Sequence, residues 1–134
     1  MIDRDQMFVL MLDAHPGFSE LWNEFADKWS KELKGLPYHL LMSDVVRECS
    51  KMLAGGQKHH ISKILEVVER WLLEGDPYVR NVAIIGFIEG IQNSSVHDGT
   101  EPKDFIQFLG PESSFWWRKV DRFWSHGELI IDDR

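Results

Sequence analysis

Residues 58–92 read KHHISKILEVVERWLLEGDPYVRNVAIIGFIEGIQ, and this stretch decides the fold class. Its first half repeats apolar residues at the three- and four-residue spacing of one helix face, with charged residues on the opposite side. Gly75 ends that helix, and Asp76 with Pro77 starts the next, because aspartate caps helix N-termini and proline is tolerated at the first helical position. Two helices joined by a short turn are therefore predicted. The apolar stripe of the first consists of Ile61, Ile64, Leu65, Val68, Trp71 and Leu72.

The second helix of this pair, about Pro77–Gln92, is apolar on both sides. A helix without a polar face is buried between neighbours. Gly86 and Gly90 lie four residues apart on one of its faces, where they lower helix propensity but permit close approach of an adjacent helix. We therefore expect another helix to pack tightly against the two glycines.

The rest of the chain also repeats apolar residues with helical spacing. Residues 6–12 are almost wholly apolar, and their methionine and leucine content favours helix over strand. A long amphipathic stripe from Phe18 to Leu33 is expected to stop at Gly35 and Pro37. The polar segment Asn93–Lys103 is interpreted as a loop. Further helices are thus predicted over residues 6–12, 16–33 and 38–53. A last helix is predicted between Pro111 and Gly127, with an apolar stripe made of Trp116, Val120, Phe123 and Trp124.

Composition supports one folded domain over residues 1–134. The chain is 43% hydrophobic and contains 6 Trp and 8 Phe, which is too much apolar material for a disordered chain. Its length suits a single domain. Helices joined by short turns predict an all-α fold in which antiparallel helical hairpins stack as a short HEAT/armadillo-like α-solenoid.

The charge balance restricts the kind of partner. The 15 Lys and Arg against 22 Asp and Glu give a formal net charge of -7. Such a chain repels a phosphate backbone, so nucleic acid is not expected to bind directly. A negative surface suits a basic protein partner instead, because complementary potentials speed encounter.

Cysteine and hydropathy indicate an expected location. The single cysteine, Cys49, allows no intrachain disulfide, and its place on an apolar stripe predicts a buried, unreactive thiol. No apolar run approaches the ~20 residues that span a bilayer, and the first residues are unlike a secretory signal. We expect a cytoplasmic protein that does not enter a membrane.

The sequence contains no recognisable catalytic, metal or cofactor motif. His59 and His60 are adjacent, so on a helix they point in directions about 100° apart rather than at one metal ion. Gly55-Gly56 lacks the Lys-Ser or Lys-Thr that follows a phosphate-binding loop. We expect no cofactor, no metal and no enzymatic activity, and an uncharacterised enzyme ranks third among the functions considered.

Partner-binding candidates are acidic residues on predicted outer faces and one tryptophan. Phe115, Trp116 and Trp117 cannot all face one core, so either Trp116 and Trp117 straddle a groove between neighbouring helices or one of them anchors an interface. For the acids, a simple solvated face is the alternative. The predicted partner-binding residues are Glu66, Glu69, Asp98, Glu101, Asp104 and Trp117.

The turn at residues 76–83 resembles the start of the second helix of a HEAT-type repeat. That pattern runs Asp-Pro, then Val-Arg, then Ala, as in Asp76-Pro77-Tyr78-Val79-Arg80-Asn81-Val82-Ala83. The resemblance covers residues 58–92, and no second copy is found in the chain. Arg80 is expected to pair with an acid on a neighbouring turn.

A wider resemblance concerns function. Glu74-Gly75-Asp76, the helix Ala83–Ile91 and the turn Phe108–Ser113 before an aromatic helix are together similar to immunity proteins of bacterial polymorphic toxin loci, including contact-dependent growth inhibition systems. This resemblance implies that the chain binds one cognate toxin domain, often a nuclease, and blocks its active site or its access to substrate. No binding residue carries over, because such pairs diversify at the interface. A helical adaptor or scaffold module without a toxin partner is the alternative.

Overall fold

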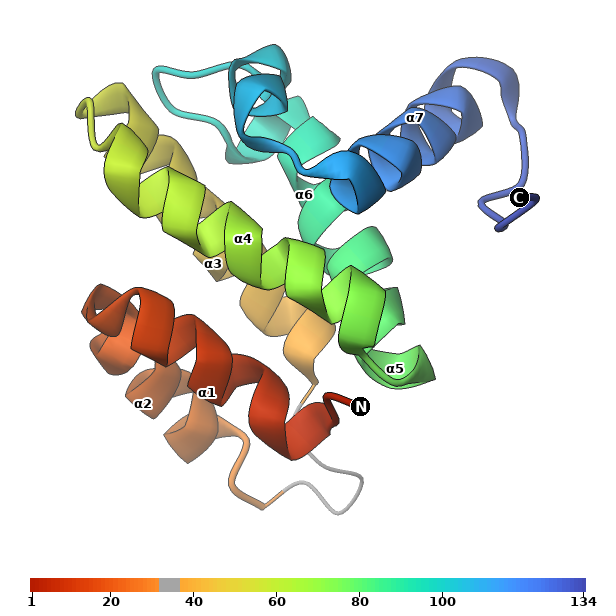
Figure 1. Ribbon diagram of the computed structural model, residues 1–134. Coiled ribbons are helices and arrows are strands. Elements are labelled where there is room, and N and C mark those ends of the chain that lie inside the picture. Colours follow the sequence, from red (N-terminus) through yellow and green to blue (C-terminus); the bar gives the residue numbers. More distant parts are fainter. Residues whose placement is uncertain (32–36) are drawn as a thin grey trace.

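The computed structural model describes residues 1–31 and 37–134, and this part of the chain is helical (Figure 1). It contains seven α-helices and no strand, which confirms the all-α prediction. Shorter helical turns are η1 (Pro16–Phe18), η3 (Ser94–Val96) and η4 (Pro102–Phe108), while η2 (Val82–Ile88) is π-helical. The α-helices are α1 (Arg4–Ala14), α2 (Ser19–Lys28), α3 (Tyr38–Ala54), α4 (Lys58–Glu74), α5 (Pro77–Asn81), α6 (Glu89–Gln92) and α7 (Pro111–His126).

The predicted helix over residues 77–92 is present as α5, η2 and α6 in direct succession. Asp76 caps it, since the Val79 N–H donates to its carboxylate at 2.9 Å, and Pro77 occupies the first turn. The turn before it is fixed from outside: the Ile2 N–H donates to the Glu74 carbonyl, and the Asp76 N–H donates to the Ile2 carbonyl, both at 2.8 Å. The cap that the sequence predicted therefore forms.

The two glycines of this helix face α3. A Cβ on Gly86 would lie 2.8 Å from Met42 Cγ, and a Cβ on Gly90 would lie 3.3 Å from Val46 Cγ2. Both methyl positions are thus already filled by α3 side chains. This confirms the expected close approach and identifies α3 as the neighbouring helix.

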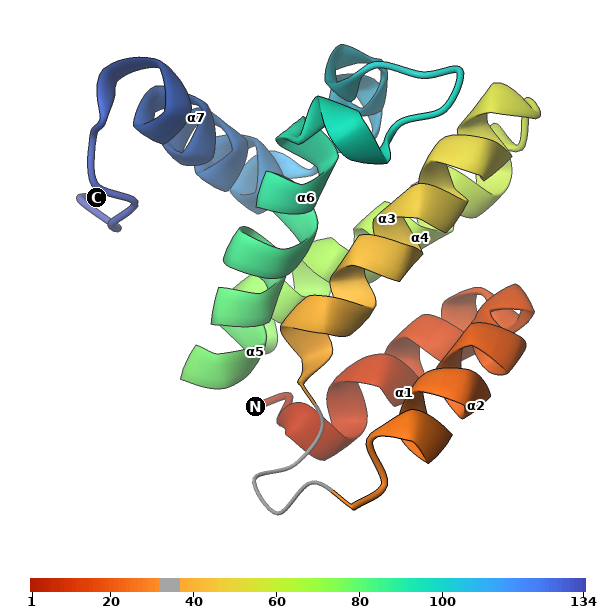
Figure 2. The same cartoon turned by 180° about the vertical axis from the view of Figure 1, so that it is seen from behind.

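The core lies between α3, α4 and their neighbours. Helix α1 packs on α4, η2 packs on α3 and α4, and α7 packs on α4 and η2. In both views α2 and α7 lie on opposite sides of α3 and α4 (Figures 1 and 2). Trp71 is fully buried, and its indole N–H donates to the Met7 carbonyl at 3.0 Å, which ties α4 to α1. Cys49 is buried as predicted, and burial raises the pKa of its thiol far above the usual value.

Two helix predictions need correction. Helix α2 ends at Lys28, before Leu33: the backbone leaves helical geometry at Trp29, and the Ser30 hydroxyl donates to the Asp27 carbonyl at 3.0 Å. Leu33 and Gly35 themselves lie outside the described residues. The aromatic stripe of α7 is buried only at Trp116 and Val120; Phe123 and Trp124 are exposed, because the C-terminal half of α7 extends past the core (Figure 1).

Arg80 does not make the pairing expected from the HEAT-like pattern. Its Nε is buried without a hydrogen-bond partner, and within the described residues Arg80 forms no ion pair. The acid it influences is Asp132: hydrogen bonds from Arg134 and, in smaller part, the Arg80 charge lower the pKa of Asp132 to about 2. The expected partner on a neighbouring turn is therefore not found in this part of the structure.

A histidine contact near the α1–α2 turn gives a pH prediction. The His15 ring lies 5.0 Å from the His60 ring and 4.7 Å from the Phe18 ring, between centroids. Burial, and then the charge of His60, lowers the pKa of His15 below 6.5. The unfolded chain therefore binds this proton first, so the stability contributed by neutral His15 is present above pH 6.5 and is lost as the pH falls through the lowered pKa.

We expect His15→Asn to reduce the fall in melting temperature that the wild-type protein shows between about pH 6.5 and 5, the range in which histidine titrates. Thermal unfolding followed by circular dichroism at each pH measures it. The matched control is His126→Asn, because His126 is exposed at the end of α7. An unchanged pH slope in His15→Asn would contradict the assignment.

Candidate functional site

Glu69, a predicted partner-binding residue, caps helix α7 from α4. Its carboxylate accepts hydrogen bonds from the Glu112 N–H at 2.9 Å, the Ser113 N–H at 2.8 Å and the Ser113 hydroxyl at 2.7 Å. An anion at this position also interacts favourably with the positive end of the helix dipole. Gly110 makes the approach possible, because a Cβ there would lie 2.6 Å from Glu69 Oε1. The half-buried Glu69 side chain thus has intramolecular partners.

The other predicted acids fall into two groups. Glu101 and Asp104 are brought together in the first turn of η4, where the Glu101 N–H donates to Asp104 Oδ2 at 2.8 Å. Glu101 also pairs with Lys103 at 3.1 Å. Glu66 and Asp98 are exposed on separate elements, and within residues 1–31 and 37–134 neither carboxylate makes a hydrogen bond or an ion pair.

The loop that carries Asp98 is anchored on α3. Ser50 is fully buried, accepts the Asp98 N–H at 2.9 Å and lies 2.6 Å from Thr100 Oγ1. His97 completes the anchor, with Nδ1 2.8 Å from Thr100 Oγ1 and Nε2 2.6 Å from the Ile91 carbonyl oxygen. The backbone at Asp98 is therefore fixed while its side chain faces solvent.

Trp117 lines a surface groove of about 660 Å³, which we call the α7 groove. Trp116 is buried in the core, and Trp117 is half-buried at the groove wall. Ile106 of η4, which is 49% exposed, and Trp124 of α7, which is 59% exposed, line the same groove. The lining comprises Gln92, Asn93, Ser94, Pro102, Lys103, Ile106, Trp117, Asp121 and Trp124.

Sequence reasoning missed Trp124, because its spacing fits the buried stripe of α7. The signal that identifies it is its position seven residues after Trp117, since residues seven apart lie on the same helix face. Once Trp117 is considered as an interface residue, Trp124 belongs to the same surface.

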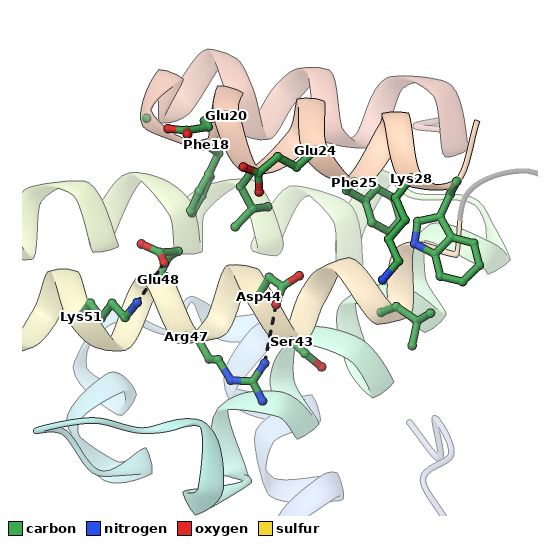
Figure 3. A pocket seen from close by; sticks show the side chains of 14 residues that line it. Phe18, Glu20, Glu24, Phe25, Lys28, Ser43, Asp44, Arg47, Glu48 and Lys51 are labelled. Atoms are coloured by element: carbon green, nitrogen blue, oxygen red, sulfur yellow. Dashed lines mark hydrogen bonds and ion pairs between the residues drawn. The ribbon is translucent and has the colours of Figure 1, made fainter. Parts of the chain in front are cut away.

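A second groove, of about 880 Å³, runs between α2 and α3 (Figure 3). We call it the α2–α3 groove. Its apolar lining includes buried Phe18 and Phe25 together with exposed Leu40. Charged side chains from both helices stand around these residues, as the close view shows. The acids are Glu20, Glu24, Asp44 and Glu48, and the bases are Lys28, Arg47 and Lys51.

The negative charge of this groove is only partly matched. Arg47 pairs with Asp44 at 3.6 Å, and Lys51 pairs with Glu48 at 3.4 Å, all on α3. Glu20 and Glu24 form no ion pair within the described residues, but neither does Lys28 on the same helix, so the four acids and three bases that line the groove leave an excess of one negative charge. Sequence reasoning did not select these acids. The signal that could have found them is their spacing: Glu20 and Glu24, and likewise Asp44 and Glu48, are four residues apart and therefore lie on one face of a helix.

We also searched the described part of the chain for metal sites and membrane-spanning helices. No group of three or more His, Cys, Asp or Glu side chains there is arranged to hold a metal ion. Among the same residues, no helix is long and apolar enough to cross a membrane. The two grooves are therefore the surfaces that we consider for function.

The family model of a domain of unknown function, DUF7674, matches residues 8–125. The chain belongs to this family. The match runs from α1 into α7 and includes all residues that line the two grooves. No curated protein and no solved structure matches the chain.

Proposed function

We propose that this DUF7674 protein acts by binding another protein, as an immunity protein that neutralises a cognate bacterial toxin domain. The observation that supports this best is the α2–α3 groove, where Glu20 and Glu24 form no ion pair, the charged side chains have an excess of one negative charge, and Leu40 is exposed. The resemblance of its turns to helical immunity proteins points in the same direction. The chain would act in the cytoplasm and without catalysis.

The proposed mechanism is occlusion. A nuclease presents cations to hold phosphate, so an acidic surface on an inhibitor can occupy the place of the nucleic acid. The apolar residues of the groove would hold the partner, while the carboxylates speed its approach, because rim charges act chiefly on association rate. Glu66 and Asp98, whose exposed carboxylates do not line this groove, are proposed together with Glu101 as a separate acidic surface, the outer rim, that would bind the same partner in place of the groove.

A solenoid arrangement belongs to the same proposal. The HEAT-like pair of residues 58–92 consists of α4 and the continuous helix α5–η2–α6, and α4 also contacts α1 on one side and α7 on the other. Stacked hairpins of HEAT type commonly bind partners on extended surfaces between helices. The α2–α3 groove is a surface of this kind, between two helices that precede the pair in the chain.

Charge reversal in the groove tests the proposal. We expect Glu20→Lys with Glu24→Lys to slow association with a basic toxin domain steeply at low salt and much less at 1 M salt, where the Debye length is about 3 Å. Stopped-flow or surface plasmon resonance rates with the product of the adjacent gene measure it. The matched control is Glu66→Lys with Asp98→Lys, which makes the same change in net charge elsewhere.

The outcomes separate the two acidic surfaces. Slower association in the groove variant alone places the partner in the α2–α3 groove, and slower association in the control alone places it on the outer rim predicted from sequence. In cells, co-expression of the wild-type chain should rescue growth from that one toxin domain. Equal rescue from unrelated toxins, or binding that ignores both variants and salt, would show that the proposal is wrong.

An adaptor or scaffold module is the second candidate. It is favoured by the presence of a second groove on α7, on the other side of α3 and α4 from α2 (Figures 1 and 2). Two separate docking surfaces would let one chain hold two partners at once. A complex of the chain with two different proteins, each lost through variants in one groove only, would support this function.

A further inference from the structure

We propose that the α7 groove binds a proline-rich segment of a partner protein in the polyproline II conformation, with a basic residue beside the prolines. Trp117 and Trp124 of α7 line this groove together with Ile106 of η4. Aromatic-lined grooves are the usual docking sites for such segments. The proposal concerns a different surface from the α2–α3 groove and does not depend on a toxin partner.

The spacing of the two tryptophans matches the repeat of the proposed ligand. Residues seven apart in an α-helix are separated by about 10.5 Å along the axis, at 1.5 Å per residue. A polyproline II segment rises about 3.1 Å per residue, so prolines three residues apart are separated by about 9.3 Å on the same face. Each indole can therefore pack against one proline ring of a Pro-x-x-Pro segment.

Asp121 is the reason that we propose a basic residue in the ligand. It lies four residues after Trp117 and three before Trp124, on the same face of α7, and it lines the groove. Within the described residues its carboxylate makes no hydrogen bond or ion pair, whereas the lysine that lines the groove, Lys103, pairs with Glu101. Among the residues that line the groove, the unpaired charge is that of Asp121, and an arginine or lysine of the ligand would complement it. On its other side Asp121 borders Arg118, Lys119 and Arg122 in a separate hollow of α7.

The groove is held in shape before any ligand arrives. The Gln92 side chain donates to the Trp117 carbonyl at 2.9 Å and ties α6 to α7 at this point. A polyproline II ligand is itself already extended and loses little conformational entropy on binding. Its carbonyls have no internal hydrogen bonds and can accept from the indole N–H groups, which are donors only.

Peptide binding to the full chain tests the proposal. The probe is a synthetic peptide with two prolines three residues apart and an adjacent arginine, and the control peptide has the same composition with the prolines side by side. We expect calorimetry and NMR shifts at α7 to show binding of the first peptide, and Trp124→Ala to weaken it about tenfold or more. Phe123→Ala is the matched control, because Phe123 is the adjacent exposed aromatic residue and does not line the groove.

The charge is tested by a double-mutant cycle. Asp121→Asn should weaken the arginine peptide about two- to fivefold and leave a peptide with glutamine in place of arginine unaffected. The proposal is overturned if the wild-type chain does not bind the Pro-x-x-Pro peptide, if it binds the control peptide with adjacent prolines equally well, or if the Trp124→Ala variant binds the Pro-x-x-Pro peptide like the wild-type chain. It is likewise overturned if a basic amphipathic helix displaces the peptide at lower concentration, or if sedimentation shows that a second copy of the chain covers Trp124. The double variant Glu20→Lys with Glu24→Lys should bind the peptide like the wild-type chain. This result would show that peptide binding in the α7 groove is independent of partner binding in the α2–α3 groove.

Discussion

Replacement of Glu69 by alanine is expected to lower the free energy of unfolding by about 2 to 4 kcal/mol, because buried donors of α7 lose a charged acceptor. The Ser113 side chain is fully buried, and both its N–H and its hydroxyl donate to Glu69. Glu66→Ala is the matched control: it removes an exposed carboxylate one turn earlier on α4 and should change stability by no more than about 0.5 kcal/mol. Urea denaturation of both variants measures the difference, and equal losses would show that the Glu69 cap contributes nothing.

Gly110→Ala tests the same contact from the side of α7. The added Cβ would meet the Glu69 carboxyl at 2.6 Å, so the variant should be destabilised by about 1 to 3 kcal/mol through displacement of the cap. The Gly110 backbone, at φ -76°, is in a conformation that alanine adopts without strain, so the loss would come from the contact with Glu69. In a Glu69→Ala background the same substitution should therefore cost much less. Additive losses in the double variant would contradict this explanation.

The first turn of α7 has a further ionic contact that this experiment leaves in place. Arg134 donates to both oxygens of Glu112, at 2.8 and 2.6 Å, and this pairing lowers the pKa of Glu112. The guanidinium of Arg134 also lies 3.9 Å from the centroid of the Phe115 ring. Because this pairing is partly exposed, it is expected to matter less than the Glu69 cap.

The second large effect is expected at Trp71. Trp71→Ala should cost about 3 to 5 kcal/mol, since it opens a cavity in a fully packed core and leaves the Met7 carbonyl without its donor. Trp71→Phe should cost less, because it keeps most of the volume and loses the hydrogen bond. The matched control is Trp124→Ala, which deletes the same side chain from an exposed position. Thermal and urea unfolding should show a small change in Trp124→Ala, and a loss as large as that of Trp71→Ala would mean that Trp124 is part of the core.

The helical fold could be predicted from local patterns in the sequence. The apolar repeat over residues 61–72 follows helix geometry, which relates only residues three or four apart. The Asp76-Pro77 start depends on a cap that spans three residues, and it formed as predicted. Gly86 and Gly90 indicated a close helix contact, although only the structure shows that α3 makes it.

The candidate sites could be predicted only in part. Trp117 was identified from three consecutive aromatics that cannot share one core, and the structure places it at a groove wall. Trp124 was missed because periodicity shows which residues share a face but does not show where the core ends along a helix. The acids of the α2–α3 groove were missed because Glu20 and Glu24 become part of a groove only through the packing of α3 beside α2, which the sequence does not show.

By itself the sequence determined that this protein is all-helical, where most of its helices begin and end, and that its surface is acidic, since these properties depend on neighbouring residues or on composition. Tertiary structure alone decided that Glu69 is a helix cap while Glu66 remains a free surface charge, although both are glutamates on one helix. The partners of Glu69 lie 43 and 44 residues away in the chain. A hydrogen bond over such a separation depends on how α4 and α7 pack, and no local pattern of residues encodes that contact.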